Sequence, residues 1–549
     1  MKILSRSEEF LRSRWIEVAL ALTALVVVSA YGIAEFPILK DMGFFSYIGQ
    51  EIARGYTPYS TVYELKPPLL FFSYALAMNA FDFLPQYMSI RVFMLVIIAV
   101  SVVLFYRVLL EATKERFVSA LSALVYLSFN FALELALLGD SKAMAMMFSF
   151  LATLLAFRKR HALSGVCAAV ALLFWQPFGV FLLVPLTLLV LEGDLWPPKF
   201  GRFAAVAIGF AIPLAVLVLY FMYIGSLTDL ANFSLLYPLK YEYASFLTRN
   251  MWTVLKTFGA YSSEFFYIAL GVTGFAYVIY KVAKDAFCGR LIGFFKGNKK
   301  LVAFSAAFAA LAIVLTNYFE AGSQFAVVLP ALSALAVLAM VKITGYIAKT
   351  VSVLAKMPYS KVWNAARLSL VVLVCAYGFF PALQPVYPEN PIFSERSEFI
   401  GKSPYELIAH IQDEYGVVGS ALSFLFRRPG EDMTIQQQLE LARMIQNSTS
   451  PDEKLLSLNA PEILFLANRR NLNQYPLFEG VGFYELAQER GELGKIKSDI
   501  VSYRPKFILY TRDSFITKLG LDDFVKANYV KSSFLDYNIY TLRGTTPIV

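Results

Sequence analysis

The stretch Asp41-Met-Gly-Phe-Phe-Ser-Tyr-Ile-Gly-Gln-Glu-Ile-Ala-Arg-Gly-Tyr-Thr-Pro-Tyr59, continued by Tyr63-Glu-Leu-Lys-Pro-Pro68, is the most informative part of this chain. Residues 43–54 have the spacing of a short amphipathic helix. We expect this helix to lie at a membrane surface with its aromatic residues toward lipid. Gly55 ends the helix, and the residues up to Tyr59 form an aromatic turn of the kind found at membrane interfaces.

The composition on both sides of this stretch is that of a membrane protein. Of the 549 residues, 58% are apolar and only 16% are charged, and the mean hydropathy is +0.58. A soluble domain carries about a quarter charged residues. The apolar residues gather in runs of about 20, the length that crosses a bilayer as a helix. This composition excludes a soluble enzyme, a coiled coil and a disordered chain.

The charge distribution predicts the orientation of the chain. Met1 to Arg14 is basic and precedes the first span, Trp15 to Ala34, without a small-residue cleavage site, so we interpret the span as an anchor. The positive-inside rule then places the N-terminus in the cytoplasm of a multi-pass cell-membrane protein. From Val386 onward, 18 Lys and Arg face 21 Asp and Glu, so the net charge of +9 arises in the first 385 residues. Cytoplasmic loops explain that excess, and nucleic acid is not predicted as a partner.

The apolar run at 68–84 decides the side on which the following loops lie. If this run crossed the membrane, the basic loop Arg107–Arg116 would face outward, against the positive-inside rule. Two prolines open the run, and its length is modest. We therefore predict that it is re-entrant or lies along the outer interface.

The remaining apolar runs alternate without conflict and predict a polytopic α-helical membrane protein. We expect about eleven transmembrane helices and outer loops at about 38–88 and 226–256. The predicted spans are Trp15–Ala34, 90–107, 117–138, 140–157, 162–176, 178–192, 202–225, 258–280, 301–316, 323–341 and 366–384. Basic stretches at 281–300 and 342–361 are read as cytoplasmic loops.

The sequence predicts two domains. Residues 1–385 form the membrane domain, and residues 386–549 form an extracytoplasmic α/β domain. In the second domain, 403–414 and 435–446 have helical spacing, whereas 454–459, 506–511 and 538–542 have the pattern of short strands.

Asp41 and Lys66 are the first candidate site residues. Asp41 lies at the outer mouth of the first span, and Lys66 lies at the same depth between the turn and two prolines. An acid and a lysine at one interface suit a substrate that carries both a lipid phosphate and a sugar. An alternative without a catalytic role also exists, because each residue alone could simply contact water or a lipid headgroup. With only two histidines in the chain, a His-based metal site or a Ser-His triad is not expected.

This stretch resembles the first extracytoplasmic loop of the C-type glycosyltransferase superfamily (the GT-C fold), which includes the protein O-mannosyltransferases and the aminoarabinose transferases of lipid A. The shared pattern is an Asp after the first span, an interfacial helix, a Gly-x-x-Pro-Tyr turn and Lys-Pro-Pro. Further similarities follow in order at Gly139-Asp140, Phe174-Trp-Gln-Pro177, Asn317-Tyr-Phe-Glu320 with Gln324 and Pro330, and Pro461–Arg470 with Tyr475.

The resemblance implies sugar transfer, with inversion, from a polyprenyl-phosphate sugar to an acceptor hydroxyl on the extracytoplasmic face. Asp41 would be the general base, Lys66 would bind the donor phosphate, and Asp140 would position the acceptor or Asp41. Asp140 could also be only a helix N-cap. The resemblance further implies substrate binding by Tyr59, Gln176, Tyr318 and Glu320. Lys240 and Arg249, in the second outer loop, are candidate phosphate or sugar contacts that no motif assigns.

The chain departs from the family pattern at two positions. Met42 stands where many members have Glu, so a second carboxylate for a divalent metal is missing there. Trp175 stands where relatives often have Lys, which removes a second phosphate contact. We predict that no cofactor is required, and the dependence on a divalent metal is left open.

Two other functions compete with the transferase. A transporter or flippase of lipid-linked sugars would have a similar basic membrane half, but it should carry ionisable groups or broken helices near the midplane. A scaffold would use the C-terminal domain as a binding module. The candidate acids cluster at the outer face, which favours the transferase. Neither the sugar nor the acceptor (protein, lipid or glycan) follows from the sequence.

Overall fold

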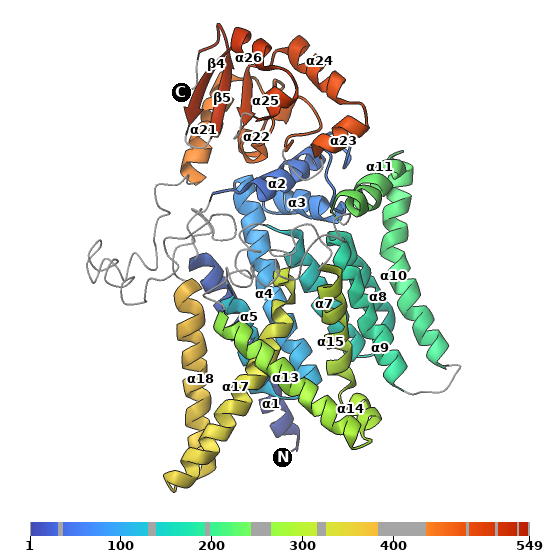
Figure 1. The fold of residues 1–549 in the computed structure, drawn as a ribbon, viewed down its shortest axis with the longest axis vertical. Coiled ribbons are helices and arrows are strands. Elements are labelled where there is room, and N and C mark those ends of the chain that lie inside the picture. Colours follow the sequence, from blue (N-terminus) through green and yellow to red (C-terminus); the bar gives the residue numbers. More distant parts are fainter. Residues whose placement is uncertain are drawn as a thin grey trace, which may run out of the picture.

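The computed structural model describes residues 2–30, 37–129, 139–192, 198–242, 265–315, 325–382, 435–478, 483–510, 514–534 and 537–546. Its described part is helical up to Ala382, and every described strand follows Lys454. The helices form one bundle, and a smaller assembly of strands and helices lies over one end of it (Figure 1). The domain boundary at 385 stays a prediction, because residues 383–434 lie outside the described residues.

The helices that run along the bundle occupy the segments predicted as spans. They are α1 (Lys2–Ala30), α4 (Gln86–Thr113), α5 (Arg116–Ser128), α7 (Ser141–Phe157), α8 (His161–Phe174), α9 (Leu183–Leu191), α10 (Pro198–Tyr223), α13 (Phe265–Phe287), α15 (Lys299–Leu315), α17 (Leu329–Leu354) and α18 (Tyr359–Ala382). Shorter elements are η1 (Gln176–Leu182), α11 (Leu227–Ala231), η2 (Asn232–Leu236), η3 (Pro238–Glu242), α14 (Leu291–Gly297) and η4 (Phe325–Val328).

Three helices of the described part are long and apolar enough, by length and composition, to cross a membrane. They are α4, α17 and residues Phe200–Tyr223 of α10. The number of about eleven crossings stays a prediction. Several predicted loop boundaries differ from the structure. The helix expected to end at 341 continues to Leu354, past Gly345, and α4 continues to Thr113 through most of the loop predicted at 107–116.

Two short helices lie across the end of the bundle instead of along it. They are α2 (Lys40–Ala53) and α3 (Leu69–Ala80), which pack against each other (Figure 1). At 1.5 Å per residue, the 12 residues of α3 extend about 18 Å, less than the roughly 30 Å of a hydrocarbon core. This geometry agrees with the prediction that the run at 68–84 does not span.

The opposite end of the bundle gathers the predicted cytoplasmic loops. Glu111 at the end of α4 pairs with Lys300 at 3.0 Å and lies 3.9 Å from Arg158, which follows α7. Glu192, after α9, pairs in the same way with Arg202 at 3.1 Å and with Lys299 at 3.8 Å. The structure therefore places the loops after α4, α7 and α9 and the start of α15 at one end, as the positive-inside reading requires.

Residues 435–546, here called the C-terminal region, form a five-stranded mixed sheet with flanking helices. The strand order is β2-β1-β3-β5-β4, with β1 parallel to β2 and β3, and β5 antiparallel to β3 and β4. The elements are α21 (Ile435–Ser448), β1 (Lys454–Ser457), α22 (Pro461–Ala467), β2 (Arg470–Asn471), α23 (Phe483–Glu489), α24 (Leu493–Tyr503), β3 (Phe507–Tyr510), α25 (Ser514–Lys518), α26 (Asp522–Asn528), β4 (Tyr529–Phe534) and β5 (Tyr537–Leu542).

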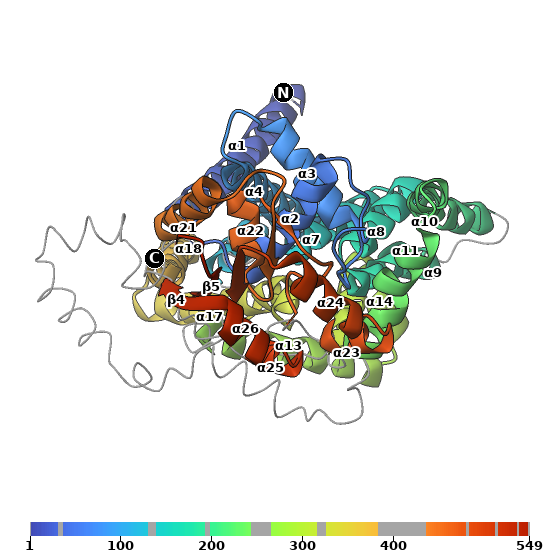
Figure 2. The ribbon, with the colours of Figure 1, turned by 90° about the horizontal axis from the view of Figure 1, so that it is seen from above.

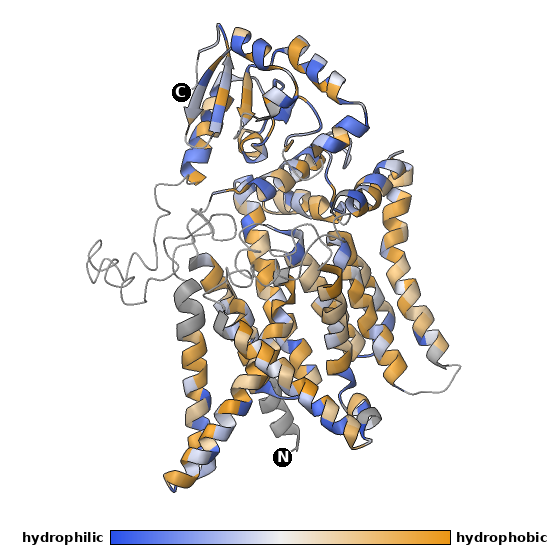
Figure 3. Cartoon of the chain, in the orientation of Figure 1, coloured by the Kyte–Doolittle hydropathy of each residue, from blue (hydrophilic) through white to orange (hydrophobic). Residues whose placement is uncertain are grey.

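The predicted helix at 435–446 and the three predicted strands are confirmed within one or two residues. The predicted helix at 403–414 lies outside the described residues. In Figure 3 the C-terminal region carries more hydrophilic residues than the bundle, in line with the 18 Lys and Arg and 21 Asp and Glu from Val386 onward.

The C-terminal region covers α2. Phe44, Phe45 and Tyr47 of this helix are at most 2% exposed, and the Phe44 ring meets that of Phe483 edge-on at 6.0 Å. The expectation that the aromatic residues of this helix face lipid is therefore wrong. Helix α2 packs against both α3 and α22, which lie next to it in Figure 2. Sequence periodicity identifies an apolar face but not the surface that buries it.

Candidate active site

Asp41 is the second residue of α2 and its side chain is exposed. The sequence places it just before the helix, whereas the structure includes it in the first turn, where a carboxylate interacts favourably with the helix dipole. The neighbouring Met42 is buried, and a Cβ built on Gly139 would lie 3.4 Å from its Cγ atom. The start of α2, which carries Asp41, therefore lies next to the start of α7, which Asp140 caps, although the two residues are 99 positions apart.

Asp140 is the N-cap of α7. Its Oδ1 atom accepts hydrogen bonds from the backbone N–H of Lys142 and from the Ser141 hydroxyl, both at 3.0 Å. Its Oδ2 atom forms an ion pair with the ammonium group of Lys142. Gly139, with a φ of +62°, makes the turn, and its carbonyl accepts a hydrogen bond from the Tyr74 hydroxyl of α3. The structure thus confirms that Asp140 is a helix N-cap, and its carboxylate is also paired with the charged group of Lys142.

Lys66 shares this environment. Its Nζ atom lies 4.4 Å from the centre of the Phe45 ring, over α2. Burial on its own would raise the pKa of Asp140, but the positive charges of Lys142 and Lys66 act against it and hold that pKa at about 2. The carboxylate of Asp140, the N-cap of α7, therefore faces two ammonium groups.

Lys142 is a site residue that our sequence reading missed. It is only 7% exposed, and its ammonium group lies 5.3 Å from the centre of the Trp175 ring. The available signal was an ionisable residue at the mouth of an apolar span, which warrants a functional hypothesis. The ammonium groups of Lys142 and Lys66 thus both act on the carboxylate of Asp140.

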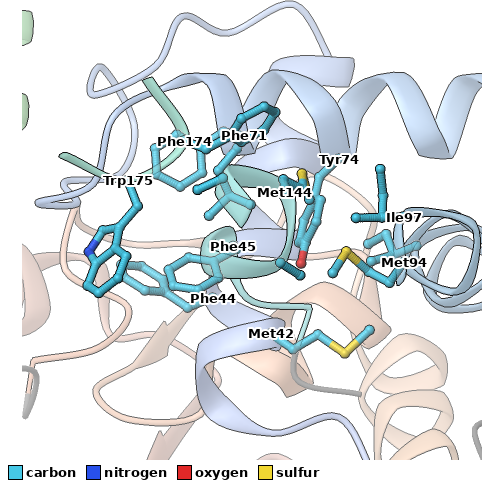
Figure 4. Packing of buried hydrophobic residues seen from close by; sticks show 14 of the residues in the cluster. Met42, Phe44, Phe45, Phe71, Tyr74, Met94, Ile97, Met144, Phe174 and Trp175 are labelled. Carbon is cyan, nitrogen blue, oxygen red and sulfur yellow. The ribbon is translucent and has the colours of Figure 1, made fainter. Parts of the chain in front are cut away.

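Aromatic rings surround these charges. Phe45, Phe71, Tyr74 and Trp175 belong to one buried cluster next to Met42 (Figure 4). The rings of Phe45 and Phe71 are 6.3 Å apart. An apolar wall of this kind lowers the local dielectric constant and strengthens the interaction of a lysine with an anion.

Tyr59 fixes the loop that carries Lys66. Its hydroxyl donates to the carbonyl of Lys66 at 2.7 Å, which leaves the hydroxyl of Ser234 as the donor in their 2.8 Å contact. Tyr59 is buried with a φ of +65°, a left-handed conformation that costs a non-glycine residue roughly 1 kcal/mol or more. The ring also stacks on Phe233 at 5.3 Å, so several contacts together hold this strained residue.

Gln176 joins the same loop to the second outer segment. Its Nε2 atom donates to the carbonyls of Ser234 at 3.0 Å and Leu65 at 3.3 Å. The predicted helix break before Pro177 is confirmed, since α8 ends at Phe174 and η1 begins at Gln176. An apolar cavity of about 290 Å³ opens beside it. The residues that line it include Gln176, Val180, Ser234, Leu235, Leu239 and Val314.

The other predicted contacts have different outcomes. Lys240 forms an ion pair with Glu489 of α23, and both side chains are about half exposed. Arg249, Tyr318 and Glu320 lie outside the described residues. Within the described ranges, no three His, Cys, Asp or Glu side chains gather in a way that could hold a metal ion.

The structure thus brings five predicted residues into one layer at the end of the bundle: Asp41, Tyr59, Lys66, Asp140 and Gln176. The arrangement can bind an anion beside an exposed carboxylate, with an apolar cavity nearby.

The chain shares its fold with solved structures of ArnT, a glycosyltransferase of the GT-C fold, and this confirms the fold that the sequence resemblance implies. It matches ArnT from Cupriavidus metallidurans bound to undecaprenyl phosphate with a TM-score of 0.56 and 13% identity over 97% of this chain and 98% of that one. The apo state of the same protein matches with a TM-score of 0.53 over 98% of both chains, again at 13% identity. No protein-family model and no curated protein sequence matches the chain.

Proposed function

We propose that this protein is a glycosyltransferase that transfers a sugar from a polyprenyl-phosphate donor to an acceptor hydroxyl on the extracytoplasmic face of the membrane. The observation that carries the proposal is that the ammonium groups of Lys66 and Lys142 both face the buried carboxylate of Asp140 in aromatic surroundings. In the proposed complex these two lysines contact the phosphate of the donor. The exposed carboxylate of Asp41 lies on the adjoining turn.

The chemistry assigns one task to each charged group. The acceptor oxygen attacks the anomeric carbon while its proton passes to Asp41, which acts as general base. The bond between the anomeric carbon and the phosphate oxygen breaks, and the electron pair leaves with the polyprenyl phosphate. Lys66 and Lys142 stabilise the negative charge that grows on this phosphate. Attack from the side opposite to the leaving group inverts the anomeric configuration.

Asp140 has a supporting task in this scheme. It caps α7 and pairs with Lys142, so it fixes the position of that ammonium group relative to the phosphate. Asp140 is buried and paired with Lys142, whereas the Asp41 side chain is exposed to an incoming acceptor. This difference in access favours Asp41 as the base.

The apolar cavity beside Gln176 suits the first isoprene units of the donor. Gln176 donates to Leu65, which precedes Lys66, so the cavity adjoins the loop that would hold the phosphate. ArnT, which has the same fold, was crystallised with undecaprenyl phosphate, and this supports a polyprenyl phosphate as the lipid part of the donor.

The first experiment measures sugar transfer by the purified protein in liposomes from a panel of radiolabelled polyprenyl-phosphate sugars. Wild-type protein is compared with Asp41→Asn, and donor binding is measured in parallel. We expect the variant to bind donor normally and to lose roughly 10²- to 10⁴-fold in kcat, the usual contribution of a general base.

Each alternative has its own outcome. Equal turnover by both proteins would exclude Asp41 as the base. Movement of an intact lipid-linked sugar across the bilayer, without transfer, would support the flippase instead. Folded protein that neither binds nor turns over any donor would refute the proposal.

A further inference from the structure

The C-terminal region holds the backbone just before Asp41. Gln438 of α21 is 3% exposed, and its side-chain amide pairs with both backbone groups of Ile38. The Ile38 N–H donates to Oε1 at 2.8 Å, and Nε2 donates to the Ile38 carbonyl at 3.0 Å. One side chain thus satisfies the two backbone groups that an adjacent strand would otherwise satisfy. Ile38 lies three residues before Asp41.

A second contact holds the backbone just after Asp41. A Cβ built on Gly43 would lie 2.7 Å from the backbone nitrogen of Glu462 and closer still to its Cα and Cβ atoms. The backbone of α2 and the start of α22 therefore touch directly at Gly43. Glycine is required here for close approach and not for its φ angle.

One hydrogen-bonded chain joins these two contacts. The Tyr537 hydroxyl of β5 accepts from Nε2 of Gln438 at 3.3 Å and donates to Oε1 of Glu462 at 2.6 Å. All three side chains are buried, and they come from α21, β5 and α22, which are separate in the sequence. A buried polar network of this kind costs free energy unless it is satisfied, and it specifies one arrangement when it is.

We propose that Gln438, Tyr537 and Glu462 are positioning residues that hold the backbone on both sides of Asp41, so that the C-terminal region is part of the catalytic unit. The inference depends on the proposed function, in which Asp41 accepts the proton of the acceptor. Asp41 itself is exposed, and its neighbours at 38 and 43 fix where its carboxylate lies. A displacement of about 1 Å at such a group costs roughly 100-fold in rate.

The test compares Gln438→Ala with Gln446→Ala in the full-length protein. Gln446 lies two turns later on α21, and its amide donates to the carbonyls of Leu466 and Ala467 at the other end of α22. We expect Gln438→Ala to lower kcat by about 10- to 100-fold with an unchanged KM for the donor. Gln446→Ala should change neither constant. Tyr537→Phe, which removes only the bridging hydroxyl, should lower kcat in the same direction by a smaller factor.

The same substitution is then made in the Asp41→Asn background. If Gln438 acts through Asp41, its removal causes no further loss of turnover there. A further loss of the same size in both backgrounds would overturn the inference. Equal loss of kcat in Gln438→Ala and Gln446→Ala would also overturn it, since that result indicates general damage to the C-terminal region.

Hydrogen exchange separates this inference from the proposed function. Amide exchange over residues 37–45 should rise in Gln438→Ala and stay as in wild type in Gln446→Ala. Unchanged exchange in Gln438→Ala, with sugar transfer intact in the wild type, would refute the positioning role alone. Absence of transfer by the folded wild type would refute the proposed function. The contact between Gln438 and Ile38 would then have no catalytic role.

Discussion

The ammonium group of Lys142 lies between the Asp140 carboxylate, with which it pairs, and the ring of Trp175, whose centre is 5.3 Å away. In the sequence resemblance, Trp175 stands where relatives often have a lysine. Lys142 reaches the face of that ring from a different helix, α7. A cation is thus present beside Trp175 although the residue at position 175 does not supply it.

The first prediction concerns Lys142→Met. We expect the donor KM to rise roughly 10- to 100-fold, since a hydrogen bond to a charged group contributes about 1.5–3 kcal/mol. Steady-state kinetics at varied donor concentration measures this change. The double variant Asp140→Asn with Lys142→Met serves as the control, because it removes the acid that would otherwise lose its partner. A donor KM that returns to the wild-type value in the double variant would show that Lys142 only neutralises Asp140.

The second prediction concerns Gly43→Ala. Alanine favours a helix over glycine by about 1 kcal/mol, so propensity alone predicts stabilisation. The new methyl group would instead meet the backbone of Glu462, which cannot rotate away as a side chain can. We expect a net destabilisation of about 1–3 kcal/mol, typical of overpacking, and a lower melting temperature in detergent.

Gly201→Ala is the matched control for that measurement. Gly201 lies in α10, and a Cβ built there has no atom within 4 Å. The same exchange in open space should leave the melting temperature equal or slightly higher. If Gly43→Ala melts at the same temperature as Gly201→Ala, α2 and α22 are not in the close contact described above.

The third prediction concerns pH. Burial raises the pKa of Glu462 from 4.5 to about 7, although the hydrogen bond from Tyr537 and the charge of Lys40 act in the opposite direction. The folded protein therefore holds this proton more tightly than the unfolded chain. The protonated Glu462 side chain therefore contributes to the free energy of unfolding. This contribution is fully present below about pH 4.5 and is lost as the pH rises through about 7.

Melting temperatures of wild type and Glu462→Gln between pH 5 and 8 check this dependence. The glutamine variant cannot ionise, so the wild type should lose stability relative to it as the pH rises. Parallel curves for the two proteins over this range would contradict the raised pKa.

Local features of the fold could be predicted from the sequence. Three such features are the amphipathic helix after Asp41, the break at Gln176-Pro177 and the strands of the C-terminal region. Each is encoded by residues that are close together in the sequence, and the structure confirms all three.

Contacts between distant segments could not be predicted in this way. Nothing near Phe44 in the sequence indicates that Phe483 covers it, and nothing near Ile38 indicates Gln438. A single sequence shows which face of a helix is apolar, whereas the choice between lipid and protein as its cover depends on residues hundreds of positions away. Lys142 was missed for a related reason, since its role depends on Trp175 from the next helix.

The pairing of Ile38 with Gln438 has a consequence for the timing of biosynthesis. These two residues are 400 positions apart. At about 5–20 residues per second, the ribosome adds the second roughly 20–80 s after the first. During that interval α2 has been synthesised, but α22 and Phe483, which pack against it in the folded protein, have not. The segment before Asp41 can therefore reach its final position only when the last fifth of the chain is being made.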